Sequence, residues 1–403
     1  MKKWVFLSCA LAAALLAAGF LPLFSPALPA NEAVLPAAVD RAGVYYKEGA
    51  VATAAAADIV MEQSGYVLSA GNAHTRMGMA STTKIMTALL AIERLDPETV
   101  VTVPKEAVGI EGSSIYLTEG EQITVSDLLY GLMLESGNDA ATALAIAAGG
   151  TVEDFVRLMN ERAAELGLED THFSNPHGLS ADDHYTTAYD LARLTCAALE
   201  NETFAAIVSC KTKTISDGRR YLSNHNRLLR SYEGCIGVKT GYTKASGRTL
   251  VSCAQRGATR FVCVTLSDPD DWNDHTRLLD WAFENYAYRA VAGDTPVYAV
   301  PVLSGTVQVC AVTPEREAYL LLRPEDTVTL TAELPRFAFA PVQQGTRAGT
   351  LTATGPDGQS VSVALCYAKP AALDPDVKIT PFARLGRLWT RVSRYFSAYY
   401  PEF

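Results

Sequence analysis

The sequence predicts an α+β protein, an antiparallel sheet with flanking helices and an inserted helical lobe, followed by a small all-β domain and an amphipathic tail helix. Strand-like stretches lie on both sides of a long helical region, at 57–70 and 248–266, so one sheet is assembled from both ends of a domain. Short Val- and Thr-rich stretches after about residue 290 indicate the all-β domain. Residues 381–403 alternate apolar and basic positions at helical spacing.

The composition limits the classes of protein to consider. The chain has 403 residues, enough for two or three domains with a sizeable core. Its 44 acidic and 34 basic residues give a net charge of −10. Nucleic acid is therefore not an expected partner, because phosphate contacts need clustered lysines and arginines. An apolar content of 49% excludes a mainly disordered chain.

Residues 1–30 are predicted to be a secretory signal peptide. Lys2 and Lys3 precede an apolar stretch, and small residues around Ala27 and Ala30 follow it, which is the order that a signal peptidase recognises. An uncleaved membrane anchor is the alternative. In both cases the body of the protein lies outside the cytoplasm.

The elements of the main domain, 31–290, follow from local patterns. A Ser64-Gly65 turn separates two strands, at 57–63 and 66–70. Helical spacing of apolar residues, with stops at Gly or Ser-Gly, predicts helices at 81–94, 125–134, 139–148, 152–166 and 187–200. A hairpin at 248–255 and 260–266 and a helix at 276–286 complete the domain.

Residues 291–372 form the predicted β-rich domain. Pro, Gly and Asp separate its short strands, which we place at 296–302, 307–312, 318–322, 327–332, 351–353 and 360–367.

The tail, 373–403, is predicted to be a membrane anchor. Four arginines lie on one side of the helix and the aromatic and aliphatic residues on the other, so it would lie in a membrane surface and not cross it. A basic tail on an acidic body also favours anionic lipid. The alternative is a helix that docks on the protein's own core.

Three short motifs carry candidate chemistry. In Ser81-Thr82-Thr83-Lys84 the serine and lysine lie on one face of a helix start, so the lysine can act as base for the serine nucleophile. Ser136-Gly137-Asn138 lies in a break between two helices, where side chains can point into a cleft. Lys239-Thr240-Gly241 precedes a predicted strand, where lysine and threonine can bind a substrate carboxylate and glycine permits close approach of substrate backbone.

Each motif occurs once, in the order used by the penicillin-recognising serine enzymes. The chain resembles the low-molecular-weight penicillin-binding proteins, the serine-type D-alanyl-D-alanine carboxypeptidases, whose catalytic domain has a transpeptidase/β-lactamase-like fold. The resemblance extends over four further segments, 134–140, 173–179, 184–188 and 237–243, and continues into the β-rich domain and tail.

The resemblance implies roles for individual residues. Ser81 would attack the bond between two terminal D-alanines of a peptidoglycan stem peptide, with Lys84 as base and Ser136 as proton relay. Backbone N–H groups of Ser81 and Tyr242 would form the oxyanion hole. The family also implies acylation by β-lactams and no cofactor or metal. The residues that would bind substrate are Asn138, Lys239, Thr240, Gly241, Tyr242 and Thr243.

One stretch departs from the family pattern. Some members carry an arginine shortly before the last helix, aimed at the substrate carboxylate, whereas this chain has Asp270-Asp271-Trp272-Asn273-Asp274-His275. Carboxylate binding is therefore expected to rest on Lys239, Thr240 and Thr243.

Three other functions share these motifs. A serine β-lactamase is disfavoured because no Glu-x-x-Leu-Asn loop lies between the second and third motifs. A non-catalytic penicillin-binding sensor is disfavoured because Ser81 and Lys84 are both present. Transpeptidation, in which an amine replaces water, is not separated from hydrolysis by sequence.

Cysteine and histidine clusters have simpler interpretations. The cysteines are read as buried thiols, with a disulfide between Cys253 and Cys263 as a possible exception across the 256–258 turn. His172, His177 and His184 lie near two aspartates, and we favour local hydrogen bonding over a metal site.

Overall fold

The computed structural model describes residues 47–48, 50–293, 298–356 and 358–375. The predicted signal peptide and the tail beyond Pro375 lie outside these residues. Within the described ranges, no helix is both long and apolar enough to cross a bilayer.

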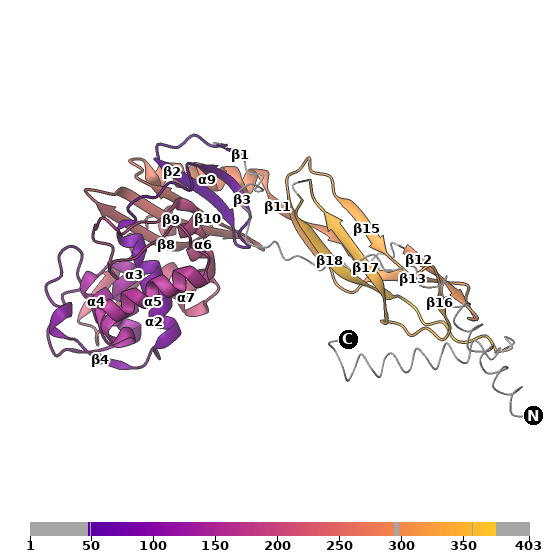
Figure 1. Cartoon of the computed structure of the whole chain (residues 1–403), viewed down its shortest axis with the longest axis horizontal. Helices are drawn as coiled ribbons and strands as arrows, with labels where there is room; N and C mark the ends of the chain where they lie inside the picture. Colours follow the sequence, from indigo (N-terminus) through magenta and orange to yellow (C-terminus); the bar gives the residue numbers. More distant parts are fainter. Residues whose placement is uncertain (1–46, 49, 294–297, 357, 376–403) are drawn as a thin grey trace, which may run out of the picture. The chain divides into compact units, whose positions relative to one another are not determined.

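The main domain is built on a six-stranded sheet in the order β1-β3-β2-β10-β9-β8 (Figure 1). Its pairs are antiparallel except for the short parallel pair between β1 and β3. The sheet joins N-terminal strands to strands beyond the helical lobe, as predicted. Its strands are β1 (Lys47–Glu48), β2 (Ala57–Glu62), β3 (Val67–Gly71), β8 (Cys235–Thr243), β9 (Gly247–Arg256) and β10 (Thr259–Leu266).

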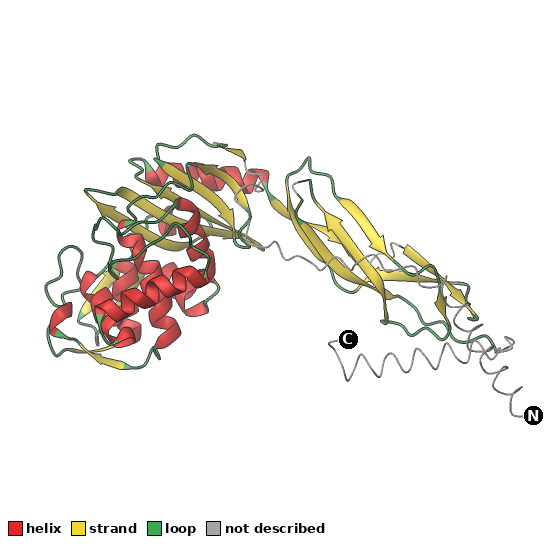
Figure 2. Cartoon of the chain, viewed as in Figure 1, coloured by secondary structure: helices red, strands yellow, loops and turns green. Residues whose placement is uncertain are grey.

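Helices cover both faces of this sheet. Helix α9 (Asp271–Asn285) packs on one face of β10 and α6 (Ala188–Leu199) on the other (Figures 1 and 2). The inserted lobe holds two 3-10 turns, η1 (Ala80–Thr83) and η2 (Lys105–Ala107), and the helices α2 (Lys84–Arg94), α3 (Val125–Leu134), α4 (Asn138–Gly149), α5 (Val152–Glu165), α7 (Glu202–Ser209) and α8 (Leu228–Ser231). Two small hairpin-like sheets complete it, β4 (Val100–Thr102) with β5 (Gln122–Thr124), and β6 (Thr212–Ile215) with β7 (Arg220–Ser223).

Threonine caps explain where three of these helices begin. In each case the threonine hydroxyl accepts a hydrogen bond from the backbone N–H of an aspartate three residues later, which satisfies one otherwise unpaired donor. The aspartate also places a negative charge at the positive end of the helix dipole. The capping pairs are Thr124 with Asp127, Thr151 with Asp154 and Thr187 with Asp190.

Two sequence predictions need correction. The last helix begins at Asp271, five residues before the predicted start at Thr276, because its Asp-rich first turn is stabilised at a helix N-terminus. Cys253 and Cys263 are both free thiols. The hairpin register pairs Cys253 with Val262 and Cys263 with Ser252, so the two sulfurs are on opposite faces of the sheet and cannot form a disulfide.

The C-terminal part is all-β, as predicted. Its larger sheet has the order β15-β17-β18-β13-β12-β16, and β11 pairs with β14 in a second sheet. The predicted boundary at residue 291 falls inside β11. The strands are β11 (Ala287–Ala292), β12 (Tyr298–Leu303), β13 (Val309–Pro314), β14 (Ala318–Leu322), β15 (Thr329–Glu333), β16 (Ala338–Phe339), β17 (Arg347–Thr354) and β18 (Ser360–Tyr367). Val300, Val312 and Leu365 lie at the centre of its core.

Candidate active site

The serine and lysine of the first motif meet at the junction of η1 and α2. Ser81 is partly exposed in η1, and Lys84, the first residue of α2, is fully buried. Lys84 Nζ lies 2.9 Å from Ser81 Oγ. The residue before the serine, Ala80, has a φ of +47°, a conformation that costs a non-glycine residue energy and is concentrated at functional sites.

The contacts of Lys84 determine how a neutral amine would be oriented. Besides Ser81, Nζ donates to Asn138 Oδ1 at 2.7 Å and to the carbonyl oxygen of His177 at 2.5 Å. Those two oxygens can only accept hydrogen bonds. A neutral amine has two N–H groups and one lone pair, so its lone pair faces the Ser81 hydroxyl. This is the orientation that a base for Ser81 needs.

Burial favours that neutral form. It lowers the pKa of Lys84 well below its usual value, and the nearby charge of Lys239 lowers it further. Burial alone lowers the pKa of Lys239 to about 7. Burial and the charge of Lys239 therefore both disfavour the protonated form of Lys84.

The second motif lies between α3 and α4. Ser136 has a φ of +62°, and its buried Oγ has no hydrogen-bond partner among the described residues. Asn138 is also buried, and its Nδ2 donates to the carbonyl of Glu111 at 2.5 Å. Both ends of the Asn138 amide are thus engaged, so in this structure the residue orients Lys84.

Asp139 supports the site, although the sequence motifs assign it no role. Its buried carboxylate accepts from Ser114 Oγ at 2.6 Å and from the backbone N–H groups of Ile115 and Leu117. These hydrogen bonds hold the 114–117 segment next to the second motif. The available signal was its place in the segment 134–140, which resembles the family.

The third motif lies on β8, at the edge of the sheet. Lys239 is buried, and its Nζ donates to the carbonyl of Thr240 at 2.8 Å. At Gly241 the strand backbone approaches η1 so closely that an added Cβ would lie 2.9 Å from Ser81 N and 2.3 Å from Thr249 Oγ1. Glycine is therefore required here to bring β8 against the nucleophile.

Tyr242 and Thr243, the last two predicted substrate-binding residues, differ in whether their side chains are free to bind substrate. Tyr242 is exposed. The Thr243 hydroxyl accepts from Ser180 Oγ and Ser246 N and donates to Ser246 Oγ, each at 3.0 Å. Thr243 therefore stabilises the β8–β9 turn, and its hydroxyl is already used within the protein.

The three histidines make separate local contacts. His184 Nδ1 accepts from Ser174 N, so its Nε2 carries the proton that is donated to Thr83 Oγ1 at 2.7 Å. Burial lowers the pKa of His184 to about 4, and burial together with Lys84 does the same for His177. His172 Nδ1 lies 2.6 Å from the carbonyl oxygen of Asp183. Within the described ranges, no group of three or more His, Cys, Asp or Glu residues could hold a metal ion.

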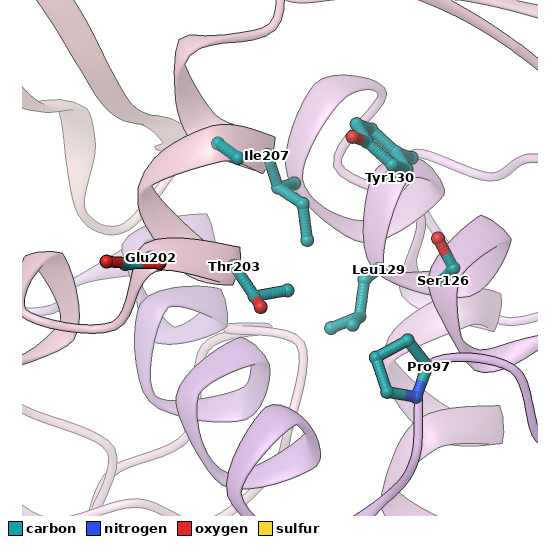
Figure 3. A pocket seen from close by; sticks show the side chains of 8 residues that line it. Pro97, Ser126, Leu129, Tyr130, Glu202, Thr203 and Ile207 are labelled. Atoms are coloured by element: carbon teal, nitrogen blue, oxygen red, sulfur yellow. The ribbon is translucent and has the colours of Figure 1, made fainter.

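A pocket between α3 and α7 lies apart from this site (Figure 3). Leu129, Tyr130 and Ile207 supply much of its apolar wall. No Lys, Arg or His of the described part of the chain lines it, so these residues offer no cation for a substrate carboxylate. The candidate chemistry remains with the three motifs.

A serine whose base is a lysine one helical turn away, beside the edge strand of an antiparallel sheet, is the arrangement of the penicillin-recognising serine peptidases. The fold and the site together define this class. Within it, the family model described as D-alanyl-D-alanine carboxypeptidase matches residues 45–270.

Individual relatives agree with that match. D-alanyl-D-alanine carboxypeptidase DacF of Bacillus subtilis is 34% identical over 357 residues, which are 84% of this chain and 90% of DacF. DacC of Escherichia coli is 37% identical over 287 residues, 66% of this chain and 68% of DacC. Penicillin-binding protein 5 of Haemophilus influenzae has a similar solved structure, with a TM-score of 0.63 and 26% identity over 80% of this chain and 98% of that one. The chain belongs to the D-alanyl-D-alanine carboxypeptidase family.

Proposed function

We propose that this chain removes the terminal D-alanine from peptidoglycan stem peptides through an acyl-enzyme on Ser81. Ser81 Oγ attacks the carbonyl carbon between the two terminal D-alanines, and Lys84 takes the hydroxyl proton. The proton passes to the leaving amine of D-alanine, and water then hydrolyses the ester on Ser81. The observation that carries this proposal is the buried Lys84 amine, whose Nζ lies 2.9 Å from Ser81 Oγ and whose two other contacts are with acceptor oxygens.

Neighbouring groups support each step. The backbone N–H groups of Ser81 and Tyr242 stabilise the oxyanion, a contribution of about 3 kcal/mol per donor in serine proteases. Ser136, whose buried hydroxyl is unpaired within the described residues, relays the proton towards the leaving amine. Lys239 and Thr240 bind the terminal carboxylate.

The position of β8 explains how a peptide would be held. Among the described strands β8 is the last of its sheet and none pairs with its outer edge, and an extended peptide can add to such an edge through main-chain hydrogen bonds. Such a peptide would pass beside Gly241, where the strand is closest to Ser81.

The proposed function also implies where in the cell the protein acts. Acting on cell-wall peptide requires an extracytoplasmic position, which the sequence at 1–30 favours. Attachment to the outer face of the cytoplasmic membrane would come from the basic amphipathic sequence at 381–403.

The test is release of D-alanine from a peptide ending in D-Ala-D-Ala. We expect the Ser81→Ala variant to lose release completely. Ser209→Ala is the matched control, because among the described residues this hydroxyl bonds only to the Ala206 carbonyl within α7, away from Lys84. Covalent labelling by benzylpenicillin should follow the same pattern.

Other outcomes identify the alternatives. Penicillin labelling without D-alanine release would indicate a sensor. Rapid turnover of penicillin would indicate a β-lactamase, and transfer of the acyl group to an added amine would indicate a transpeptidase. Neither labelling nor release would refute Ser81 and Lys84 as a working pair.

A further inference from the structure

The substrate carboxylate needs a cation with free donors. Lys239 Nζ donates one hydrogen bond to the Thr240 carbonyl, and a lysine cannot bind a carboxylate through two parallel donors as an arginine can. The stretch where some relatives carry an arginine has Asp271 and Trp272 in this chain. The structure shows what Asp271 binds there: it is buried, and its carboxylate accepts from Arg248 Nε at 3.1 Å and Nη2 at 2.7 Å.

Arg248 comes from a different element, the strand β9. It is the register partner of Tyr242 and a diagonal neighbour of Thr240, which pairs with Leu250. These side chains therefore leave the same face of the sheet. The Arg248 side chain is 43% exposed, and no described residue accepts a hydrogen bond from its Nη1.

The orientation of the guanidinium is fixed on two sides. Asp271 holds its Nε and Nη2 edge, and the ring of Trp272 lies 5.8 Å from its central carbon. A planar guanidinium held in this way is pre-organised to bind a second carboxylate with its remaining donors.

We propose that Arg248 binds the terminal carboxylate of the substrate together with Lys239 and Thr240, and that Asp271 is the positioning residue that holds Arg248. This rests on the proposed carboxypeptidase function. The cation comes from β9, and Asp271, the first residue of α9, supports it.

The test compares two peptides that differ only in the C-terminal group, one a free acid and the other its amide. For each we would measure kcat/KM for release of the last residue, with Arg248→Leu beside the wild type. Loss of a hydrogen bond between two charged groups should lower the acid-to-amide ratio of kcat/KM by roughly 10- to 100-fold. Arg248→Lys keeps the charge and should lose less.

Arg256 provides a matched control on the same strand. Its side chain is 42% exposed, and it approaches Asp280 of the same helix, α9. Arg256→Leu should leave the acid-to-amide ratio unchanged. Asp271→Asn should raise KM for the acid more than it lowers kcat, as expected for lost positioning and not for lost chemistry.

Each result is decisive. A wild-type ratio in Arg248→Leu, with release still abolished by Ser81→Ala, would overturn the Arg248 proposal and leave the carboxypeptidase function intact. No release by the wild-type chain would overturn the proposed function itself. If Arg248→Leu fails to fold, the ratio in Arg248→Lys decides.

In the C-terminal domain, one edge of the larger sheet carries an exposed apolar surface. Phe337 and Phe339 are 46% and 61% exposed, with ring centroids 5.4 Å apart. The register pairs Phe339 with Leu303 and Pro301 with Val309, all exposed. We call these five residues the β12–β16 patch.

The described chain ends beside this patch. Leu373 bridges to Gly305, and Asp374 N donates to the carbonyl of Ser304, the residue after Leu303. Five residues lie between Pro375 and Pro381, where the basic amphipathic sequence begins, and the six steps from one proline to the other span at most about 20 Å. If that sequence lies in a membrane surface, the patch is held next to the same surface.

We infer that the β12–β16 patch contacts the lipid surface beside the tail, an inference that rests on the proposed membrane attachment. Two weak contacts anchor a protein more firmly than one. The test is binding of the full chain to vesicles that contain anionic lipid. Phe337→Ser/Phe339→Ser should weaken binding at least about 10-fold.

Leu330→Ser is the matched control, because Leu330 is 42% exposed on β15, at the opposite edge of the same sheet. Unchanged binding of the double variant would overturn the patch inference and leave tail attachment standing. Loss of a wild-type dimer in the double variant would overturn it in favour of a second copy. No vesicle binding by the wild type would refute membrane attachment itself.

Discussion

Replacing Gly241 with alanine should separate the stability of the site from its chemistry. The new Cβ would lie 2.3 Å from Thr249 Oγ1, 2.9 Å from Ser81 N and 3.1 Å from Ala80 Cβ. The first contact is with a side chain, but the second is with the backbone amide proposed for the oxyanion hole. Overpacking of this kind costs about 1–3 kcal/mol. A shift of the amide by up to 1 Å would cost about 100-fold in rate.

The assay is kcat for D-alanine release together with Tm. Gly241→Ala should lose about 100-fold in kcat and roughly 2–10 °C in Tm. Gly293→Ala is the control, because nothing lies within 4 Å of its added Cβ. The double variant Gly241→Ala/Thr249→Ala removes the closest contact and should recover part of the Tm, but not kcat. Wild-type kcat in Gly241→Ala, or in Gly241→Ala/Thr249→Ala, would refute the claim that Gly241 sets the position of Ser81 N.

Three further predictions concern a helix cap, a titration and a buried carboxylate. Thr151→Ala removes the cap of α5 and should lower the free energy of unfolding by about 1 kcal/mol. Urea denaturation measures this loss, and D-alanine release should stay unchanged. An unchanged denaturation midpoint would contradict the role of Thr151 as a cap. Burial lowers the pKa of Lys239 from 10.5 to about 7, so between those values the unfolded chain binds more protons and wild-type stability should rise with pH. Lys239→Met should lack this component, and parallel stability curves for the two proteins from pH 7 to 10 would count against it. Asp139→Asn weakens the acceptor for the 114–117 segment and should lower both Tm and penicillin acylation rate, whereas normal acylation would show that this segment does not support the site.

Local patterns predicted much of the helical lobe. The helix at 125–134 has the predicted bounds because a threonine cap and a Ser-Gly break delimit it. The strand at 360–367 is equally well marked by Gly and Asp before it. Each of these signals lies within a few residues of the boundary that it sets.

Features that depend on register were not predictable. Whether Cys253 faces Cys263 is decided by a one-residue offset across the hairpin, which the turn sequence did not reveal. The position of the Arg248 side chain was not predictable because it depends on Asp271, 23 residues later, and on the pairing of two strands. The engagement of the Thr243 hydroxyl with Ser180 likewise joins segments that are distant in sequence.

The free edge of β8 has a cost for solubility. A sheet edge that can accept a substrate can also pair with the edge of another molecule and start aggregation. Two features of β8 oppose that pairing: a bulge between Cys235 and Gly237, and a lysine, Lys239, that points inward in the middle of the strand. A flat, uncharged strand would bind its neighbours as readily as its substrate. Substituting Lys239 by an apolar residue would therefore remove a gatekeeper against self-association as well as a member of the site.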